Sequence, residues 1–297
     1  MDKYLVCMEI GGTNLRYGIL DTQLRLLCFH KTPTQALSDA ADKIAFLTNV
    51  IEPLLKEYGR ENILCVSMAL ASLMDKERTT LYSSPMVRGF ENLEIVQALG
   101  TKLGLPIVIE KDVNILLLYE INRCGRSREG IVSGVFLGTG LGNAMCIDGR
   151  VYRGSNGVAC ELGHIPVLGL NADCGCGKKG CIELLACGRL LQKLASGYGC
   201  HITELFSRHG READVRQVVY AFAVAIATEI TILDPAYVIL GGGVVEMEGF
   251  PLDYLKESIA ENLRIPNPRE ALTIVPASGD EHAGVVGAAI HAMQVLA

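Results

Sequence analysis

Two strand–glycine turn–strand units, one in each half of the chain, constrain the fold of this sequence most strongly. The first consists of the apolar stretch Tyr4–Ile10, the turn Gly11–Thr13 and the apolar stretch Leu15–Leu20. The second consists of Val132–Leu137, the turn Gly138–Gly142 and a short returning strand. Apolar strands that are joined by such short turns pair as antiparallel neighbours. We therefore expect two sheets that each open with a hairpin.

The rest of the chain alternates between helical and strand patterns, which is typical of α/β proteins. Helices are predicted at Ala36–Tyr58, Leu93–Leu103, Val113–Cys124, Val215–Leu233 and Gly284–Leu296, and further strands at Leu24–His30, Ile63–Ala69, Ile107–Glu110, Tyr237–Leu240 and Thr273–Val275. We expect a small α/β domain made of residues 1–114 and completed by the C-terminal helix, 285–297. A larger α/β domain would span 115–284.

Charge and composition narrow the choice of partners. The net charge is −6 and Trp is absent, which argues against nucleic acid or an anionic membrane as a partner. The most apolar helical stretch, Val218–Thr228, is bounded by Arg216 and Glu229 and is too short to span a bilayer. No signal peptide is visible, so we expect a cytoplasmic protein.

Glycine turns between strands favour phosphate binding. Adjacent glycines such as Gly11 and Gly12 are able to adopt conformations that other residues avoid, and their N–H groups form an anion nest. The alternative is an ordinary hairpin turn. A third glycine run, Gly241–Gly243, follows an apolar strand, and Gly284 and Gly287 open the last helix. The sequence has no Walker A motif, and no G-x-G-x-x-G motif lies between a predicted strand and a predicted helix, so a Rossmann dinucleotide site is disfavoured.

A histidine and three cysteines form a candidate metal site. Three thiolates from Cys174, Cys176 and Cys181 and the imidazole of His164 are able to close a tetrahedral Zn²⁺ site. Such a site would be structural, because protein fills all four positions. The alternative is a group of free buried thiols, since a reducing compartment disfavours disulfides.

Several motifs resemble the ROK family of sugar kinases and repressors, in the family's order. They are Glu9-Ile10-Gly11-Gly12-Thr13-Asn14-Leu15-Arg16, Leu137-Gly138-Thr139-Gly140, Glu161-Leu162-Gly163-His164, the segment Cys174–Glu183, and Leu240-Gly241-Gly242-Gly243. The resemblance covers nearly the whole chain and is greatest to bacterial D-allose kinases. It implies a two-domain actin-like ATPase (ribonuclease H-like) fold with a cleft between the domains, ATP with Mg²⁺, a homodimer, and phosphorylation of the 6-hydroxyl of an aldohexose such as D-allose.

The resemblance also implies site residues. ATP would contact Glu9, Gly11, Gly12, Thr13, Asn14, Arg16, Gly138, Thr139, Gly140, Gly142, Gly241, Gly242 and Gly243. The sugar would contact Lys111, Asp112, Glu161, His164 and Glu183. Asp112 corresponds to the family's catalytic base. From its own position, at the start of a helix after an apolar strand, it is equally well interpreted as a helix cap. Glu161 and Glu183 each also fit a surface or capping role.

Some residues depart from the usual family pattern. Glu9 stands where Asp is common, Lys111 where Asn is common, and Ala69–Ser72 replaces a Pro-Gly segment. The last two departures lie near the expected acceptor pocket, so kinases for glucose, fructose or an N-acylated mannosamine remain alternatives. A repressor is disfavoured because the first motif begins at Glu9, leaving no room for a DNA-binding domain. A sensor without catalytic activity is disfavoured by Asp112.

Overall fold

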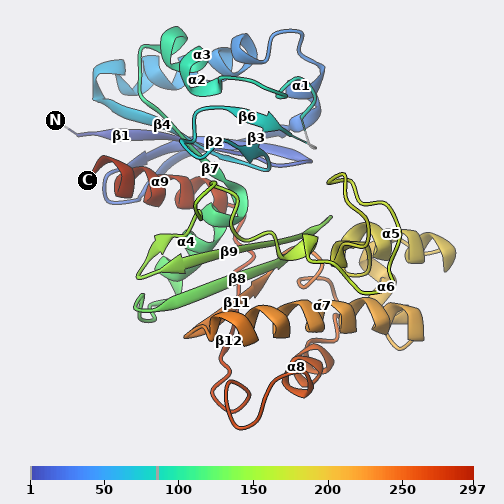
Figure 1. Ribbon diagram of the computed structural model, residues 1–297. Coiled ribbons are helices and arrows are strands. Elements are labelled where there is room, and N and C mark those ends of the chain that lie inside the picture. The colour runs from blue at the N-terminus through green and yellow to red at the C-terminus, as the bar shows by residue number, and fades with distance from the viewer. Residues whose placement is uncertain (1, 85–86) are drawn as a thin grey trace. The chain divides into compact units, whose positions relative to one another are not determined.

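In the computed structural model, which describes residues 2–84 and 87–297, the chain forms two compact units. Unit 1 contains residues 1–126, 153–159 and 280–297, and unit 2 contains residues 127–152 and 160–279. Each unit is built around a five-stranded mixed sheet (Figure 1). The two units are described separately below.

Unit 1 has the strand order β3-β2-β1-β4-β7, in which β1 to β3 are antiparallel and β4 and β7 run parallel to β1. The strands are β1 Tyr4–Ile10, β2 Asn14–Asp21, β3 Leu26–Pro33, β4 Ile63–Leu70 and β7 Ile107–Lys111, with a small hairpin of β5 Leu73–Met74 and β6 Leu81–Ser83. The helices are α1 Thr34–Asp39, α2 Lys43–Tyr58, α3 Ile95–Leu103, α4 Asp112–Cys124 and α9 Ala283–Leu296.

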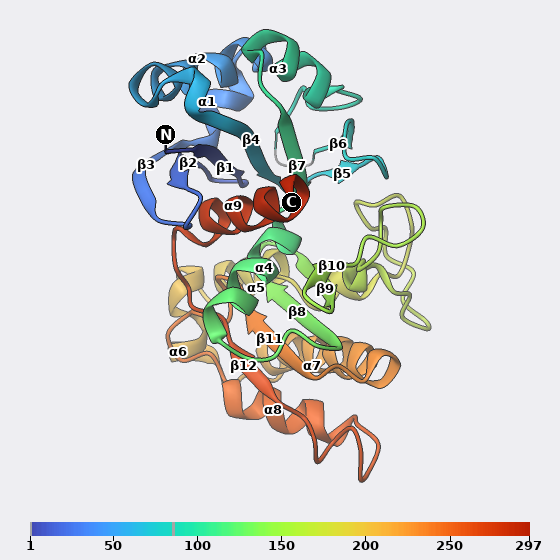
Figure 2. The same ribbon diagram turned by 90° about the vertical axis from the view of Figure 1, so that its left-hand side faces the viewer.

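Helices cover both faces of this sheet, with α2 and α3 on one side and α9 and α4 on the other (Figure 2). The alternation of side chains along β1 explains the two layers, because successive residues point to opposite faces. Val6 and Met8 pack in the cluster with α2 and α3, whereas Leu5 and Cys7 pack with Ala288 and its neighbours on α9. The first strand is therefore buried on both faces.

Unit 2 repeats the arrangement, with the strand order β10-β9-β8-β11-β12. Its strands are β8 Ile131–Leu137, β9 Leu141–Ile147, β10 Arg150–Val151, β11 Tyr237–Gly241 and β12 Ile274–Pro276, and its helices are α5 Gly188–Gly197, α6 Leu205–His209, α7 Ala213–Leu233 and α8 Leu252–Glu261. The hairpin β8–β9 is antiparallel, and β11 lies parallel to β8. The two predicted hairpins therefore each place their first strand at the centre of a sheet.

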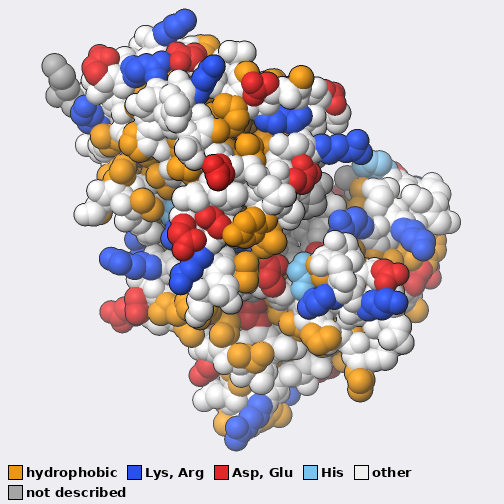
Figure 3. Space-filling view, turned by 45° about the horizontal axis from the view of Figure 1, so that its top comes forward, with side chains coloured by type: hydrophobic (Ala, Val, Ile, Leu, Met, Phe, Trp, Pro, Cys, Tyr) orange, Lys and Arg blue, Asp and Glu red, His pale blue; other side chains and the backbone are white. Residues whose placement is uncertain are grey.

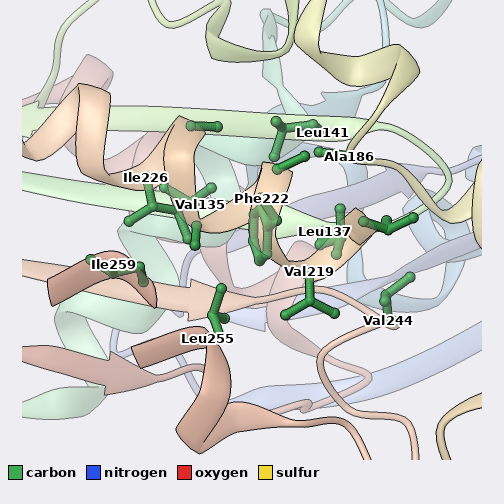
Figure 4. Packing of buried hydrophobic residues seen from close by; sticks show 14 of the residues in the cluster. Val135, Leu137, Leu141, Ala186, Val219, Phe222, Ile226, Val244, Leu255 and Ile259 are labelled. Atoms are coloured by element: carbon green, nitrogen blue, oxygen red, sulfur yellow. The ribbon is translucent and has the colours of Figure 1, made fainter. Parts of the chain in front are cut away.

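The core of unit 2 lies between this sheet and α7. Phe222 of α7 is fully buried and lies against Val135 and Leu137 of β8 (Figure 4). Leu141, the first residue of β9, belongs to the same cluster. The turn between the strands is therefore Gly138–Gly140, shorter than the predicted Gly138–Gly142, and a buried leucine flanks it on each side.

The prediction that the apolar helix is too short to span a bilayer is wrong. Helix α7 extends beyond Val218–Thr228 to 21 residues, which by length and composition alone is enough to cross a membrane. However, 61% of its most apolar 18-residue window is buried inside the protein, and its apolar side chains form the core of unit 2. We therefore interpret α7 as a core helix.

Two boundaries differ from the sequence-based expectation. The stretch predicted as one helix, Ala36–Tyr58, forms α1 and α2, because the helix restarts where Asp42 accepts a hydrogen bond from the N–H of Ala45. The division between 1–114 and 115–284 would cut through α4. Ile115 of this helix packs against Gly287 of α9, where an added Cβ would lie 2.4 Å from the Ile115 carbonyl oxygen, so α4 stays with unit 1.

Candidate functional site

The first glycine turn joins β1 to β2 in unit 1. The N–H of Gly11 donates to the carbonyl of Asn14 (3.1 Å), and the hydroxyl of Thr34 donates to the carbonyl of Gly11 (2.7 Å). Gly12 and Thr13 are exposed at the tip of the turn. The expectation of unusual backbone angles is wrong here, since neither Gly11 nor Gly12 has a positive φ. An added Cβ at Gly11 would meet only the carbonyl oxygen of Asn14, at 3.4 Å.

Glu9 and Arg16 face each other across this hairpin. They are paired in the β1–β2 register, and Arg16 Nη1 lies 2.8 Å from Glu9 Oε2. Burial raises the pKa of Glu9, the charge of Asp112 adds to that rise, and Arg16 opposes it. A Cβ at Gly284, in the first turn of α9, would lie 2.4 Å from Glu9 Cδ. The first glycine turn, Asp112 and the start of α9 therefore lie around the carboxylate of Glu9.

Asp112 is the first residue of α4, directly after β7. The N-cap position belongs to Lys111, and Asp112 Oδ1 accepts a hydrogen bond from the N–H of Val113 (2.9 Å). The helix-cap interpretation of Asp112 therefore differs from the structure by one position. A carboxylate in the first turn of a helix is stabilised by the helix dipole.

The sequence did not predict a hydrogen-bond network around Glu110, two residues before Asp112. Glu110 is fully buried and accepts hydrogen bonds from Arg78 Nε (3.0 Å), Arg153 Nε (2.6 Å), Asn114 Nδ2 (2.9 Å) and the N–H of Lys111 (2.9 Å). Burial opposes ionisation, but the two guanidinium groups outweigh it and lower the pKa of Glu110. No spacing in the sequence links these residues, since the fold alone brings them together.

The second glycine turn, in unit 2, holds the predicted sugar ligand Glu183. The N–H of Leu141 donates to Glu183 Oε2 (3.0 Å), and a Cβ at Gly140 would lie 2.5 Å from the same oxygen. At Gly138, by contrast, an added Cβ would meet no atom within 4 Å. The turn is therefore open on one side and in close contact with a carboxylate on the other.

In the third glycine run, Gly241 is the last residue of β11 and Gly243 lines a cavity. Gly242 has a φ of +98°, and a Cβ there would lie 2.5 Å from the carbonyl oxygen of Leu137, so glycine is required at this position. The cavity has a volume of about 600 Å³, and the residues that line it are Thr203, Glu204, Ser207, Arg208, Gly243 and Glu246–Glu248. Apart from Gly243, no motif in the sequence predicted these lining residues.

The four predicted metal ligands lie together. The donor atoms of His164, Cys174, Cys176 and Cys181 all lie within 4.8 Å of one another. His164 Nδ1 is 3.8 Å from Cys174 Sγ, and the sulfur atoms of Cys176 and Cys181 are 3.6 Å apart. This donor set and its compactness fit a tetrahedral Zn²⁺ ion, which takes thiolate and imidazole ligands.

Local backbone geometry closes the cysteine loop. Gly177 and Gly180 have φ values of +88° and +71°, and a Cβ at Gly180 would lie 2.2 Å from the carbonyl oxygen of Leu170. The N–H of Ile182 donates to the carbonyl of Ile165 (3.0 Å). These contacts place the turn with His164 beside the turn that carries Glu183.

The other nitrogen of His164 faces the remaining predicted sugar ligand, Glu161. His164 Nε2 lies 3.8 Å from Glu161 Oε2, whereas Nδ1 faces the thiols. Both side chains are partly exposed. The imidazole therefore stands between the cysteine cluster and a carboxylate that is accessible to a ligand.

A series of buried hydrogen bonds connects α7 to the segment that contains Glu161 and His164. Glu229 of α7 accepts hydrogen bonds from the hydroxyl of Ser133 and from Asn143 Nδ2 (3.1 Å). Asn143 Oδ1 in turn accepts the N–H of Leu162 (2.8 Å), the residue after Glu161. Burial raises the pKa of Glu229 to about 7, and its two hydrogen bonds only partly oppose this.

The described surface is mixed in charge. On the face shown in Figure 3, Lys and Arg side chains lie among Asp and Glu side chains. This arrangement agrees with the net charge of −6 for the whole chain.

A protein-family model described as the ROK family matches residues 5–295. A glucokinase from Streptomyces coelicolor is 30% identical, with 95% of both proteins covered. An N-acetyl-D-glucosamine kinase from Aliivibrio salmonicida is also 30% identical, over 95% of this chain and 97% of that protein. The family model and both relatives each cover nearly the whole chain.

Solved structures agree on the architecture. A ROK hexokinase from Thermus thermophilus superposes with a TM-score of 0.82 at 28% identity, covering 99% of both chains. A ROK family glucokinase from Streptomyces griseus, solved in complex with glucose and AMPPNP, gives a TM-score of 0.79 at 26% identity over 98% of this chain and 99% of that one. The fold is therefore the actin-like ATPase fold. Within that class, the chain belongs to the ROK family.

The buried carboxyl of Glu229 predicts a pH-dependent stability. Its pKa rises from an ordinary 4.5 to about 7 on folding, so the folded state binds more protons than the unfolded state between these values. The free energy of unfolding should therefore fall by about 3 kcal/mol as pH rises through this window and then level off. Glu229→Gln should remove this fall and be more stable than the wild type at about pH 8. Urea unfolding across the range checks this, and equal pH profiles for the two proteins would refute it.

Proposed function

We propose that this chain is an ATP-dependent sugar kinase that transfers the γ-phosphoryl group to the 6-hydroxyl of an aldohexose. The observation that carries the proposal is the direct hydrogen bond between the Gly138–Gly142 turn and Glu183. It places a carboxylate suited to sugar hydroxyls beside a turn suited to phosphate. The names of the relatives, glucokinase and N-acetyl-D-glucosamine kinase, support the same class of reaction.

The glycine turns are the proposed phosphate sites. Gly11–Asn14 with Arg16 would bind phosphate in unit 1, and the Gly138–Gly142 turn and Gly241–Gly243 would do so in unit 2. The buried Nε of Arg16 has no hydrogen-bond partner among the described residues, which suits a phosphate oxygen. Mg²⁺ would neutralise the charge that develops on the phosphates. Glu9, already paired with Arg16, would reach the metal through water.

Asp112 is the proposed base. As the acceptor hydroxyl attacks the γ-phosphorus, its proton passes to the Asp112 carboxylate, and ADP leaves. Glu9 adds negative charge near Asp112, and the first turn of α4 adds the positive end of a helix dipole. Glu110 accepts the N–H of Lys111 beside it and so holds the end of β7 in place.

Replacing Asp112 with Asn should remove the base and keep the shape of the pocket. We expect kcat to fall by about 10²–10⁴-fold, with sugar binding still measurable. Asp253→Asn is a matched control, because Asp253 is also in the first turn of a helix and is exposed. Steady-state kinetics and calorimetric sugar binding test this, and a near-normal kcat in Asp112→Asn would exclude Asp112 as the base.

D-allose is the proposed substrate. Lys111 precedes the proposed base, and Ala69–Ser72 spans the end of β4, with Ser72 buried and its N–H donating to the carbonyl of Leu70 (2.9 Å). These two departures from the common family pattern lie on neighbouring strands at the same sheet edge, since Leu70 pairs with Lys111. An altered acceptor pocket at this edge favours a sugar other than glucose.

A coupled ADP-release assay over a sugar panel tests this choice. D-allose should give the highest kcat/KM, ahead of glucose, fructose, N-acetylglucosamine and N-acetylmannosamine. Lys111→Asn should narrow the gap between allose and glucose. A higher kcat/KM for another sugar would replace allose while keeping the kinase proposal, and no phosphorylation of any hexose would end both.

The proposal includes a structural zinc ion. His164, Cys174, Cys176 and Cys181 would hold it, and the ion would fix the loops that carry Glu161 and Glu183. The Nε2 of His164 would remain available toward Glu161. Zinc in such a site supplies folding energy rather than chemistry.

Purified protein should contain about one zinc ion per chain, held with its thiols protected from titration. Cys176→Ser should lose most of the metal and lower Tm. Cys200→Ser, a partly buried cysteine outside the cluster, should retain the metal. Metal analysis by mass spectrometry and thermal unfolding measure both effects. Absence of zinc, with Cys174, Cys176 and Cys181 freely titratable in the folded protein, would refute the site.

A further inference from the structure

Glu183 is held at both carboxylate oxygens, and only one of the two partners belongs to the glycine turn. Oε2 accepts the N–H of Leu141 (3.0 Å), and Oε1 lies 2.6 Å from Nη2 of Arg189. The side chain of Glu183 is 13% exposed, whereas that of Arg189 is 59% exposed. The arginine therefore closes over a mostly buried carboxylate from the solvent side.

The backbone of Arg189 is attached to the same glycine turn. Its N–H donates to the carbonyl of Thr139 (3.1 Å), and the N–H of Gly188 donates to the carbonyl of Gly138 (2.9 Å). A Cβ at Gly188 would lie 2.3 Å from the carbonyl oxygen of Gly138, so the start of α5 packs directly on the turn. Arg189 thus contacts the turn with its backbone and Glu183 with its side chain.

These contacts form a closed ring. From Thr139 the ring passes through Arg189 to Glu183, and from Glu183 it returns through the N–H of Leu141 to the turn. Gly140 lies inside, where its missing side chain leaves room for the Glu183 carboxylate. A displacement of the turn is therefore transmitted to the carboxylate, and a displacement of the carboxylate to the turn.

We infer that Arg189 is a positioning residue that couples sugar binding at Glu183 to phosphate binding at the Gly138–Gly142 turn. The inference rests on the proposed function, in which Glu183 binds the sugar and the turn binds ATP. A bound sugar fixes Glu183, the ring then fixes the turn, and the nucleotide binds a turn that is already ordered. Coupling of this kind is reciprocal, so nucleotide raises sugar affinity by the same factor.

The expected size of the effect follows from the exposure of the pair. A largely exposed ion pair contributes at most about 1 kcal/mol, which corresponds to a factor of about five in an equilibrium constant. Arg189→Gln should therefore lower the coupling factor by about threefold to fivefold. The coupling factor is the Kd for nucleotide without sugar divided by the Kd with saturating sugar. Because Arg189 is exposed, Tm should stay close to that of the wild type.

The experiment is a pair of calorimetric titrations on the full chain. Mg²⁺–AMPPNP is titrated with and without saturating D-allose, and D-allose is titrated with and without Mg²⁺–AMPPNP. D-glucose is run in parallel as a second sugar. The proteins are the wild type, Arg189→Gln, Arg189→Lys and Lys193→Gln. Lys193 is exposed on the same helix, so its variant changes the charge by the same amount without touching Glu183.

The inference predicts a reduced coupling factor in Arg189→Gln, the same reduction from both directions, partial recovery in Arg189→Lys and no change in Lys193→Gln. A wild-type factor of one would overturn it. An unchanged factor in Arg189→Gln would also do so, even if both separate affinities weakened, because that pattern describes a purely structural residue. A wild-type protein that phosphorylates no hexose would instead refute the proposed function.

Discussion

The hydrogen bond from the N–H of Leu141 to Glu183 joins two segments of unit 2 that lie 42 residues apart in the sequence. One is a hairpin turn whose ends, Leu137 and Leu141, are buried in the core under α7. The other is the cysteine-rich segment, in which most residues from 166 to 180 are exposed. Because the hairpin is rigid, the carboxylate has a fixed point of attachment. The position of Glu183, the proposed sugar ligand, depends on this attachment.

The second support of the same region is the cysteine–histidine cluster. Cys174 and Cys181 follow His164 by 10 and 17 residues in the sequence, and their sulfur atoms lie in one group with its imidazole. A metal ion at this point would replace the hydrophobic core that so short a segment is unable to build. The chain from Glu229 through Asn143 to Leu162 supports the opposite end of the loop. Glu161 and Glu183 are thereby held from several sides.

Much of the fold could be predicted from the sequence, because both hairpins and most helices follow from local apolar periodicity. The strand Tyr4–Ile10 matches β1 at both ends. Only part of the candidate site could be predicted in this way. Spacing within 18 residues, together with the resemblance to the ROK family, predicts the grouping of His164 with the three cysteines. Arg78 and Arg153 around Glu110, and Glu229 below Leu162, could not be predicted, because only tertiary packing brings residues so distant in sequence together.

Local rules also failed where the fold imposed its own conditions. Gly11 and Gly12 suggested unusual backbone angles, but neither has a positive φ. Gly140 and Gly188 lack side chains because Glu183 and the Gly138 carbonyl occupy the volume. The apolar stretch Val218–Thr228 is by itself too short to cross a bilayer, but it is part of the longer helix α7, in which Glu229 finds buried partners in Ser133 and Asn143.

The central claim is that this protein moves the γ-phosphoryl group of ATP onto the 6-hydroxyl of an aldohexose. The most direct test is to incubate the protein with Mg²⁺–ATP and D-allose labelled with ¹³C at carbon 6 and to record ³¹P and ¹³C spectra of the product. The account predicts one new phosphomonoester whose phosphorus couples to carbon 6, formed in equal amount to ADP. Phosphate attached to carbon 1, or ADP released with inorganic phosphate and unchanged sugar, would contradict it.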